Sequence, residues 1–285
     1  LSLHDALPIS EASQYIVWMD DALAIELGAD IHGAVGDVFI NADGFKKSIS
    51  APGPGNYITM AKAVASAKAI LGEESIRLRS LIQAHGSSTP QNRVTESQIF
   101  DQVAQVFGIE NWPVSAVKAY VGHSLSAASG EQLIASLGVF KYGLIPGIKT
   151  IDKVADDVFA DRLQISTKDV FASQPLDVAF LNSKGFGGNN ATASIFAPHV
   201  VERMLARRYG DTIIARYEDK REQVRAAAQA YDQAAQRGDF ATIYHFGEGL
   251  IDESQIKLDQ DKVQLPGFAH AVDLTFTNRF ADMCE

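Results

Sequence analysis

Histidine, lysine and glycine residues gather in three short segments of this sequence, where they could do chemistry. The segments are residues 85–90 (HGSSTP), 118–123 (KAYVGH) and 185–190 (GFGGNN). The imidazoles of His85 and His123 and the ammonium of Lys118 could donate hydrogen bonds to a substrate oxygen that gains negative charge. The glycines of the third segment would let the backbone approach a ligand closely.

Other chemistries need features that these segments lack. A zinc site built on His85 and His123 would need further ligands at fixed spacing, and none is evident. The glycine-rich segment lacks the GxGxxG and GxxxxGK[ST] patterns of nucleotide-binding loops. Ser124 has no GxSxG elbow around it, which disfavours a serine hydrolase. Taken singly, a histidine, a lysine or a glycine turn is more often structural. A functional interpretation therefore depends on the three segments acting together.

Each segment follows a short apolar run that predicts a strand, over residues 80–84, 113–117 and 178–181. Helical patterns alternate with these runs over residues 59–71, 95–107 and from about 124 to 140. A further strand is expected over residues 31–40 and a hairpin return over 192–196. This alternation predicts an α/β layered sheet, in which loops at the carboxyl ends of strands collect functional groups. The three segments should therefore converge.

Composition limits the classes of function. A net charge of −10 argues against bulk nucleic-acid binding, which needs a basic surface. The sole cysteine, Cys284, allows no internal disulfide, so a reducing, cytoplasmic location is expected. No apolar run is long enough to predict a membrane span. Residues 1–10 lack a secretory signal pattern and are interpreted as a non-native or unstructured leader. Residues 198–285 predict a mostly helical C-terminal extension, with a long helix over about 213–237.

The three segments, in this order, resemble the motifs of the β-ketoacyl synthases of the thiolase superfamily. HGSSTP with Glu96 beyond it resembles HGTxTP…E, Lys118 with His123 resembles KxxxGH, and residues 185–190 resemble GFGGxN. The resemblance implies that residues 11–197 form the second half of a layered α/β/α thiolase-like fold. Three positions depart from the family pattern: Ser87 replaces a threonine, Arg93 replaces a common aspartate, and Lys184 stands where an aromatic residue often precedes the Gly-Phe pair.

The same resemblance implies an activity. Family members join malonyl-[acyl-carrier-protein] to an acyl thioester by decarboxylative Claisen condensation, in fatty-acid or polyketide synthesis. His85 and His123 would stabilise the charged thioester oxygen, and Lys118 with Glu96 would orient the site. Substrate contacts are implied for five residues: Ser87 and Thr89 with the phosphopantetheine arm, and Phe186, Gly187 and Gly188 at the acyl pocket. No bound cofactor is implied, because phosphopantetheine arrives on acyl carrier protein or coenzyme A.

The main departure from the family pattern is the lack of a nucleophilic cysteine in a family motif. The family's acyl-accepting cysteine belongs to the first half of the fold, and Cys284 has no motif around it. We therefore expect a truncated synthase that lacks its N-terminal half, is inactive alone, and is homodimeric when complete. The alternative is a non-catalytic partner of the chain-length-factor type, which keeps the fold without its own cysteine. A cysteine or another residue in the upstream strand-to-helix turn would distinguish the two.

Overall fold

The computed structural model describes residues 7–45, 52–239 and 242–284. The chain divides into two compact units, Leu1–Ala227 and Ala228–Glu285. The boundary falls inside helix α8 (Asp211–Gln236), further along the chain than residue 198, where the extension begins by sequence. The candidate site lies wholly within the first unit.

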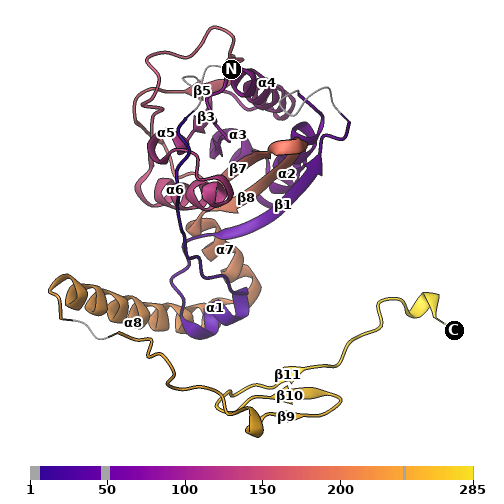
Figure 1. Cartoon of the computed structure of the whole chain (residues 1–285), viewed down its shortest axis with the longest axis vertical. Coiled ribbons are helices and arrows are strands. Elements are labelled where there is room, and N and C mark those ends of the chain that lie inside the picture. Colours follow the sequence, from indigo (N-terminus) through magenta and orange to yellow (C-terminus); the bar gives the residue numbers. More distant parts are fainter. Residues whose placement is uncertain (1–6, 46–51, 240–241, 285) are drawn as a thin grey trace. The chain divides into compact units, whose positions relative to one another are not determined.

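A six-stranded sheet forms the centre of the first unit (Figure 1). Its four central and edge strands β7, β2, β3 and β5 are parallel, whereas β8 pairs antiparallel with both β7 and β1. In sheet order the strands are β1 (Ala34–Ala42), β8 (Asn189–Phe196), β7 (Val178–Gly185), β2 (Ser80–Gln83), β3 (Trp112–Ser115) and β5 (Leu163–Ile165). Both β2 and the first half of β7 are buried on both faces, because helices cover both sides of a parallel sheet.

Two apolar clusters lie on opposite faces of this sheet. On one face Ile82 and Phe180 pack with α2 (Gly55–Leu71), α3 (Glu73–Leu78) and α4 (Pro90–Phe107). On the other face the neighbouring strand residues Leu81 and Ala179 pack with α6 (Ala128–Tyr142). The alternation of side chains along each strand therefore divides its residues between the two helical layers. The layered α/β/α arrangement predicted from the sequence is confirmed (Figure 1).

The predicted helices are present, but some of them begin at other residues than the sequence predicted. Helix α4 begins at Pro90 rather than near residue 95, because proline at the first helical position has the backbone angle the helix needs and no N–H to satisfy. Helix α1 (Asp21–Leu27) begins after Asp20, whose carboxylate accepts the N–H of Leu23. The helix ends before Gly28, whose backbone adopts the left-handed conformation.

The start of the predicted extension packs with the sheet domain. Helix α7 (Pro198–Tyr209) places Val200, Val201 and Leu205 in the apolar cluster beside α2. The first part of α8 contacts the segment after α1, where Tyr217 donates to the Ala29 carbonyl (2.9 Å) and Arg225 pairs with Asp30. Two short strands, β4 (Leu144–Ile145) and β6 (Val170–Phe171), form a separate ladder.

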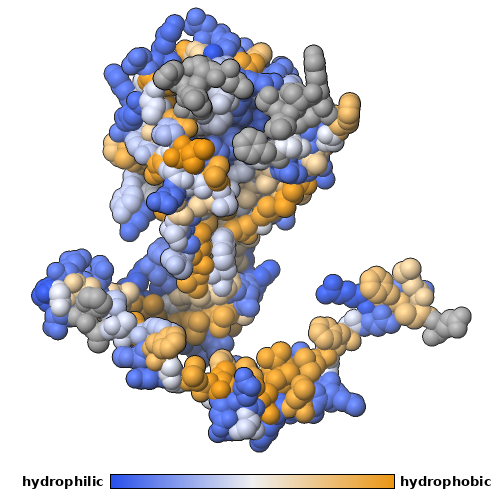
Figure 2. All heavy atoms as spheres, in the orientation of Figure 1, coloured by the Kyte–Doolittle hydropathy of each residue, from blue (hydrophilic) through white to orange (hydrophobic). Residues whose placement is uncertain are grey.

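The second unit has a different character. It contains three short antiparallel strands, β9 (Lys257–Leu258), β10 (Lys262–Gln264) and β11 (Val272–Asp273), with the 3₁₀ turns η4 (Glu253–Gln255) and η5 (Ala281–Met283). None of its described residues is buried, and apolar side chains such as Phe246, Leu258 and Phe276 stand exposed (Figure 2). Across the described part of the chain, every helix is too short or too polar to cross a membrane.

Candidate active site

The His85 loop connects the end of β2 to α4 and folds back onto Glu96. The Glu96 carboxylate accepts the backbone N–H of His85 at Oε1 (2.7 Å) and that of Gly86 at Oε2 (3.0 Å). Gly86 has a φ of 55°, and a Cβ there would lie 3.0 Å from the Cβ of Ala116. A glycine is therefore required at this turn. The loop is held by a carboxylate that lies eleven residues further along the chain.

Glu96 itself is buried and fully hydrogen-bonded. Besides the two backbone groups it accepts Asn182 Nδ2 at Oε1 (2.8 Å) and Asn92 Nδ2 at Oε2 (3.0 Å). Burial would raise the pKa of the Glu96 carboxyl, but the charges of His85 and Lys184 and these hydrogen bonds hold it below its ordinary value. The group is thus a buried carboxylate with a donor on each of its four lone-pair directions, which is what makes its burial tolerable.

Lys118 lies on the short helix α5 (Lys118–Val121) and is 2% exposed. Its ammonium donates to the His85 carbonyl (2.6 Å) and lies 3.1 Å from His85 Nδ1. Burial lowers the pKa of Lys118 to about 8, while the charges of Glu96 and Glu131 act in the opposite direction. Lys118 therefore contacts both the backbone carbonyl and the ring of His85.

These contacts determine which ring nitrogen of His85 carries the proton. His85 Nδ1 accepts the backbone N–H of Lys184 (3.3 Å) and faces the Lys118 ammonium, so the proton of the neutral ring lies on Nε2. Burial lowers the pKa of His85 to about 4; Lys118, His123 and Lys184 add to this effect, and Glu96 opposes it. At neutral pH His85 is therefore an uncharged Nε2–H donor.

His123 reaches the same state by a different contact. Its Nδ1 accepts the backbone N–H of Leu125 (3.1 Å) at the start of the 3₁₀ turn η2 (Leu125–Ala127), so its proton is also on Nε2. Burial and then the Lys118 charge lower the pKa of His123. The next α-helix, α6, begins only at Ala128, five residues beyond His123. Burial, the nearby Lys118 charge and the N–H of Leu125 therefore favour the neutral ring.

The two imidazoles lie against each other, with ring centroids 5.4 Å apart and planes at 83°. Each is neutral, and each has its Nδ1 occupied by an N–H donor. Two preorganised neutral donors can hold one oxygen that becomes negative during a reaction, which is the arrangement of an oxyanion hole. Lys118 and the histidine pair are thus brought together from two segments, the loop after β2 and the segment that begins at α5.

The other predicted site residues lie in the loop between β2 and α4 and in the turn between β7 and β8. Ser87 Oγ and Thr89 Oγ1 are 3.4 Å apart, and Thr89 makes no capping bond with its hydroxyl although it precedes α4. Gly187 and Gly188 have φ of 78° and 86° in the turn between β7 and β8, where the Gly188 carbonyl accepts the N–H of Asp43. The side chain of Phe186 lies outside the described part of the structure.

Known proteins are similar to this chain in sequence and fold. The family model for the beta-ketoacyl synthase C-terminal domain matches residues 32–152. The chain is 61% identical over 277 residues to beta-ketoacyl-[acyl-carrier-protein] synthase FabY of Pseudomonas aeruginosa, an alignment covering 97% of this chain and 44% of FabY. The crystal structure of that ketosynthase superposes with a TM-score of 0.88 and covers 94% of this chain. The chain belongs to the β-ketoacyl synthase family.

More distant synthases are also similar to this chain in sequence or in fold. A 3-oxoacyl-[acyl-carrier-protein] synthase 2 from Synechocystis is 29% identical over 189 residues, which is 66% of this chain and 43% of that protein. A ketosynthase domain from Streptomyces albus, 19% identical over 62% of this chain with a TM-score of 0.55, shows a common fold. The chain spans less than half the length of these curated relatives.

Sequence reasoning missed several buried polar residues that hydrogen-bond around the His85 loop. Asn182 joins Glu96 to Asn56 (Nδ2 of Asn56 to Oδ1 of Asn182, 2.6 Å) and to Thr192. Gln132 Nε2 donates to the carbonyls of Gln83, Ala84 and Asn182, and so ties the ends of β2 and β7 together. The available signal was a polar residue inside an apolar strand or helix, where burial requires a partner.

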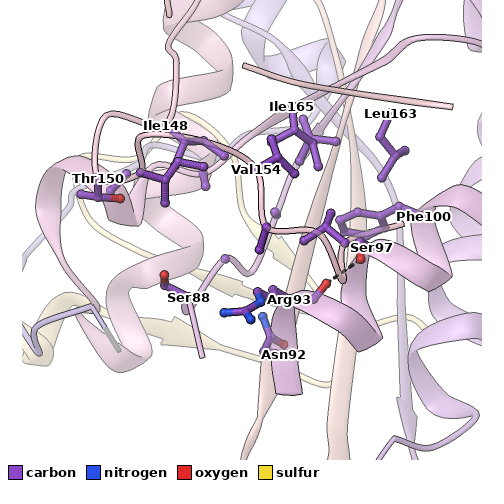
Figure 3. Close-up of a pocket in the computed structure, with 18 of the residues that line it drawn as sticks. Ser88, Asn92, Arg93, Ser97, Phe100, Ile148, Thr150, Val154, Leu163 and Ile165 are labelled. Atoms are coloured by element: carbon purple, nitrogen blue, oxygen red, sulfur yellow. Dashed lines mark hydrogen bonds between the residues drawn. The ribbon is translucent and has the colours of Figure 1, made fainter. Parts of the chain in front are cut away.

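A cavity of about 180 Å³ lies beside the loop between β2 and α4 (Figure 3). Phe100, Leu163 and Ile165 contribute apolar walls, and Ser88 and Arg93 lie on its loop side. Arg93, one of the three departures from the family pattern, pairs with Asp157 (2.9 Å). None of the predicted catalytic side chains lines this cavity. It is separate from the histidine pair.

The segment before the domain also reaches the site. Residues 7–10, within the predicted leader, run parallel to His123: the His123 N–H donates to the Pro8 carbonyl (2.8 Å) and the Ser10 N–H donates to the His123 carbonyl (3.1 Å). Cys284 is exposed and belongs to the second unit. Among the residues that the structure describes, no cluster of His, Cys, Asp or Glu side chains could hold a metal ion.

Proposed function

We propose that this chain supplies the oxyanion-binding half of a condensing enzyme that joins malonyl-[acyl-carrier-protein] to an acyl thioester. The observation that carries the proposal is the pair of neutral imidazoles, each locked as an Nε2–H donor by an N–H that occupies its Nδ1. Such a pair suits a reaction whose charge develops on a carbonyl oxygen and which needs no general base at the rings.

The proposed reaction has two steps. The bond between the α-carbon of the malonyl group and its carboxylate breaks, carbon dioxide leaves, and the electron pair passes into the thioester as an enolate. The α-carbon then attacks an enzyme-bound acyl thioester, a carbon–carbon bond forms, and the enzyme thiolate leaves. Negative charge develops on a thioester oxygen in both steps. His85 and His123 would stabilise it there without the full charge that an imidazolium would bring.

The nucleophilic thiol must come from elsewhere. Cys284 is the only cysteine of the chain, and it lies exposed in the second unit, whereas the histidine pair lies in the first. We therefore place the nucleophile on a segment outside these 285 residues, so that the chain alone would not carry the acyl group. The hydroxyls of Ser87 and Thr89 would contact the phosphopantetheine arm. The complete protein would be a cytoplasmic homodimer that acts with acyl carrier protein in fatty-acid synthesis.

The test is condensation by the complete protein. The coding sequence upstream of residue 11 would be recovered, the restored chain expressed, and product formation measured with malonyl-[acyl-carrier-protein] and a short acyl-CoA. His123→Ala should lower the rate of condensation by about 10²–10³-fold, the usual loss when one oxyanion donor is removed. His270→Ala, at an exposed position of the second unit, is the matched control and should leave the rate unchanged.

Two results would overturn the proposal. Condensation at an unaltered rate in His123→Ala would show that the histidine pair does not hold the reacting oxygen. Absence of condensation in the restored chain, together with absence of an upstream cysteine, would assign the protein instead to the non-catalytic partner subunits that keep the fold.

A further inference from the structure

The cavity beside the loop between β2 and α4 has no part in the proposed reaction. It measures about 180 Å³, and its inner wall is apolar, formed by Phe100, Val114, Leu163 and Ile165 (Figure 3). Well-packed protein cores leave few voids larger than a water molecule. An apolar cavity of about 150 Å³ stays dry and binds small apolar molecules such as benzene. This cavity is therefore large enough for a ligand with roughly six or seven apolar carbon atoms.

The segment that covers the cavity, residues 148–162, is held by one face of α4. The contacts lie one helical turn apart along the helix: Arg93 pairs with Asp157 (2.9 Å), the N–H of Phe159 donates to Ser97 Oγ (3.1 Å), and the N–H of Arg162 donates to Asp101 (3.0 Å). Because three successive points of the segment are fixed in this way, it is not free to collapse onto the strands beneath it. The cavity is thus a built feature of the fold.

The two sides of the cavity differ in polarity, which indicates the kind of ligand. Ser88, Asn92 and Arg93 lie on the side of the His85 loop, away from the apolar wall (Figure 3). Lys153 also lines the cavity, whereas among the described residues no aspartate or glutamate does so. Ser88 has a φ of 64°, a strained conformation for a serine that is typical of loops at ligand sites. An apolar chain that ends in acceptor oxygens therefore matches this lining better than an amine.

We propose that this cavity binds the tail of a medium-chain acyl group, with the oxygens of its carboxylate or thioester at the Ser88 side. Such a site goes beyond the proposed function and does not depend on it. The cavity is separate from the histidine pair, since neither imidazole lines it. Thr150 and Lys153 line it and are exposed, so a ligand can enter from solvent.

A bound chain would contact the loop that carries His85. Gly86 lines the cavity, and its N–H donates to the Glu96 carboxylate. Asn92, another lining residue, donates to the same carboxylate. A chain that fills the space beside this loop restricts its local opening, so exchange of the loop amides with solvent should slow on binding.

Binding can be measured by calorimetry on the restored chain, with straight-chain carboxylates from butanoate to dodecanoate. The affinity should rise about fourfold with each added methylene until the cavity is full, near octanoate, and then level off. Octylamine should bind at least about tenfold more weakly than octanoate, because no acidic side chain among the described lining residues balances its charge. Octanoyl-pantetheine distinguishes the two sources of the acyl group. Tighter binding than octanoate assigns the site to thioesters, and weaker binding assigns it to free acids.

Two substitutions in the covering segment assign the binding to this cavity. Val154→Phe should weaken octanoate binding by at least about tenfold, since the ring takes the space of several methylenes, and should abolish the slowing of loop exchange. Ile151→Ala enlarges the cavity and should shift the tightest binding to a longer acid, decanoate. Val106→Phe, at an exposed valine of α4 outside the cavity, is the matched control and should bind as the unaltered protein does.

Two results would overturn this assignment. Equal binding of octanoate by the unaltered protein and Val154→Phe would place the acid elsewhere, for example in the acyl pocket of the condensing site. Absence of binding by the restored chain would also contradict it, as would be the case if the upstream half filled the cavity. Failure of the restored chain to condense, while octanoate still binds and Val154→Phe still weakens that binding, would count against the proposed function alone.

Discussion

The buried ammonium of Lys118 should make the stability of the fold depend on pH in the alkaline range. The pKa of this lysine is lowered from 10.5 to about 8, chiefly by burial. Between these two values the unfolded chain keeps a proton that the folded protein has released. The free energy of unfolding therefore rises with pH over this interval, and the penalty for holding a charged lysine inside is fully present below about pH 8.

The change in the free energy of unfolding can be calculated from the lowering of the Lys118 pKa. At about 1.4 kcal/mol per pH unit, a lowering from 10.5 to about 8 corresponds to about 3 kcal/mol in the free energy of unfolding. Lys118→Met removes this titration while keeping a long apolar side chain in the buried space. The variant also loses the donor to the His85 carbonyl, a loss of about 1–3 kcal/mol that is present at every pH.

The assay is urea unfolding of the unaltered chain and of Lys118→Met at pH 7 and near pH 10.5. Groups common to both proteins cancel in the difference, so the difference in the free energy of unfolding should change by about 3 kcal/mol in favour of the unaltered chain as pH rises. Lys68→Met, at an exposed lysine, should show no such change. Parallel pH curves for the unaltered chain and Lys118→Met would refute the reasoning, because Lys118 would then titrate alike in the folded and unfolded states.

Four further outcomes are expected. Glu96→Gln should lower the free energy of unfolding by about 2–4 kcal/mol in chemical denaturation, because the new amide NH₂ faces two N–H donors that lose their acceptor. Phe100→Ala should lower it by about 3–5 kcal/mol, since this core ring also walls the cavity. His85, whose pKa falls to about 4, takes up its proton later than the unfolded chain on acidification. Stability should therefore fall between about pH 6.5 and 4, and His85→Gln should lessen that fall. Cys284→Ser should leave condensation by the restored chain unchanged, and a large loss would contradict the placement of the nucleophile elsewhere.

The layered fold and the gathering of the three motif segments could be predicted from short-range patterns. Strands β2, β3 and β7 each contain a short apolar run, and a motif residue or glycine turn follows each run within a few residues. Parallel strands bring the loops that follow them to one edge of the sheet. His85 and Lys118 come together by this rule alone. The family resemblance added the roles, which geometry alone does not assign.

The supporting contacts could not be predicted, because they join residues far apart in the chain without any periodic signal. Asn182 meets Glu96 and Asn56 only after β7 has inserted beside β2. Lys184 reaches His85 through a backbone group, which no side-chain pattern reports. The short strands of the second unit were missed for a different reason. They have neither alternation nor buried residues, so the usual strand signal is absent.

The contacts on the Nδ1 side of the two rings bear directly on their strength as donors. A hydrogen bond accepted at Nδ1 withdraws electron density from the imidazole, and chains of hydrogen bonds polarise one another in a setting of low dielectric constant. Lys118 and the Lys184 N–H act on His85 in this way, and the Leu125 N–H acts on His123. The same contacts that keep the rings neutral therefore also make each Nε2–H more acidic. A neutral but polarised donor stabilises a developing oxyanion more than the uncharged thioester, so these supporting residues act on the transition state through the rings they hold.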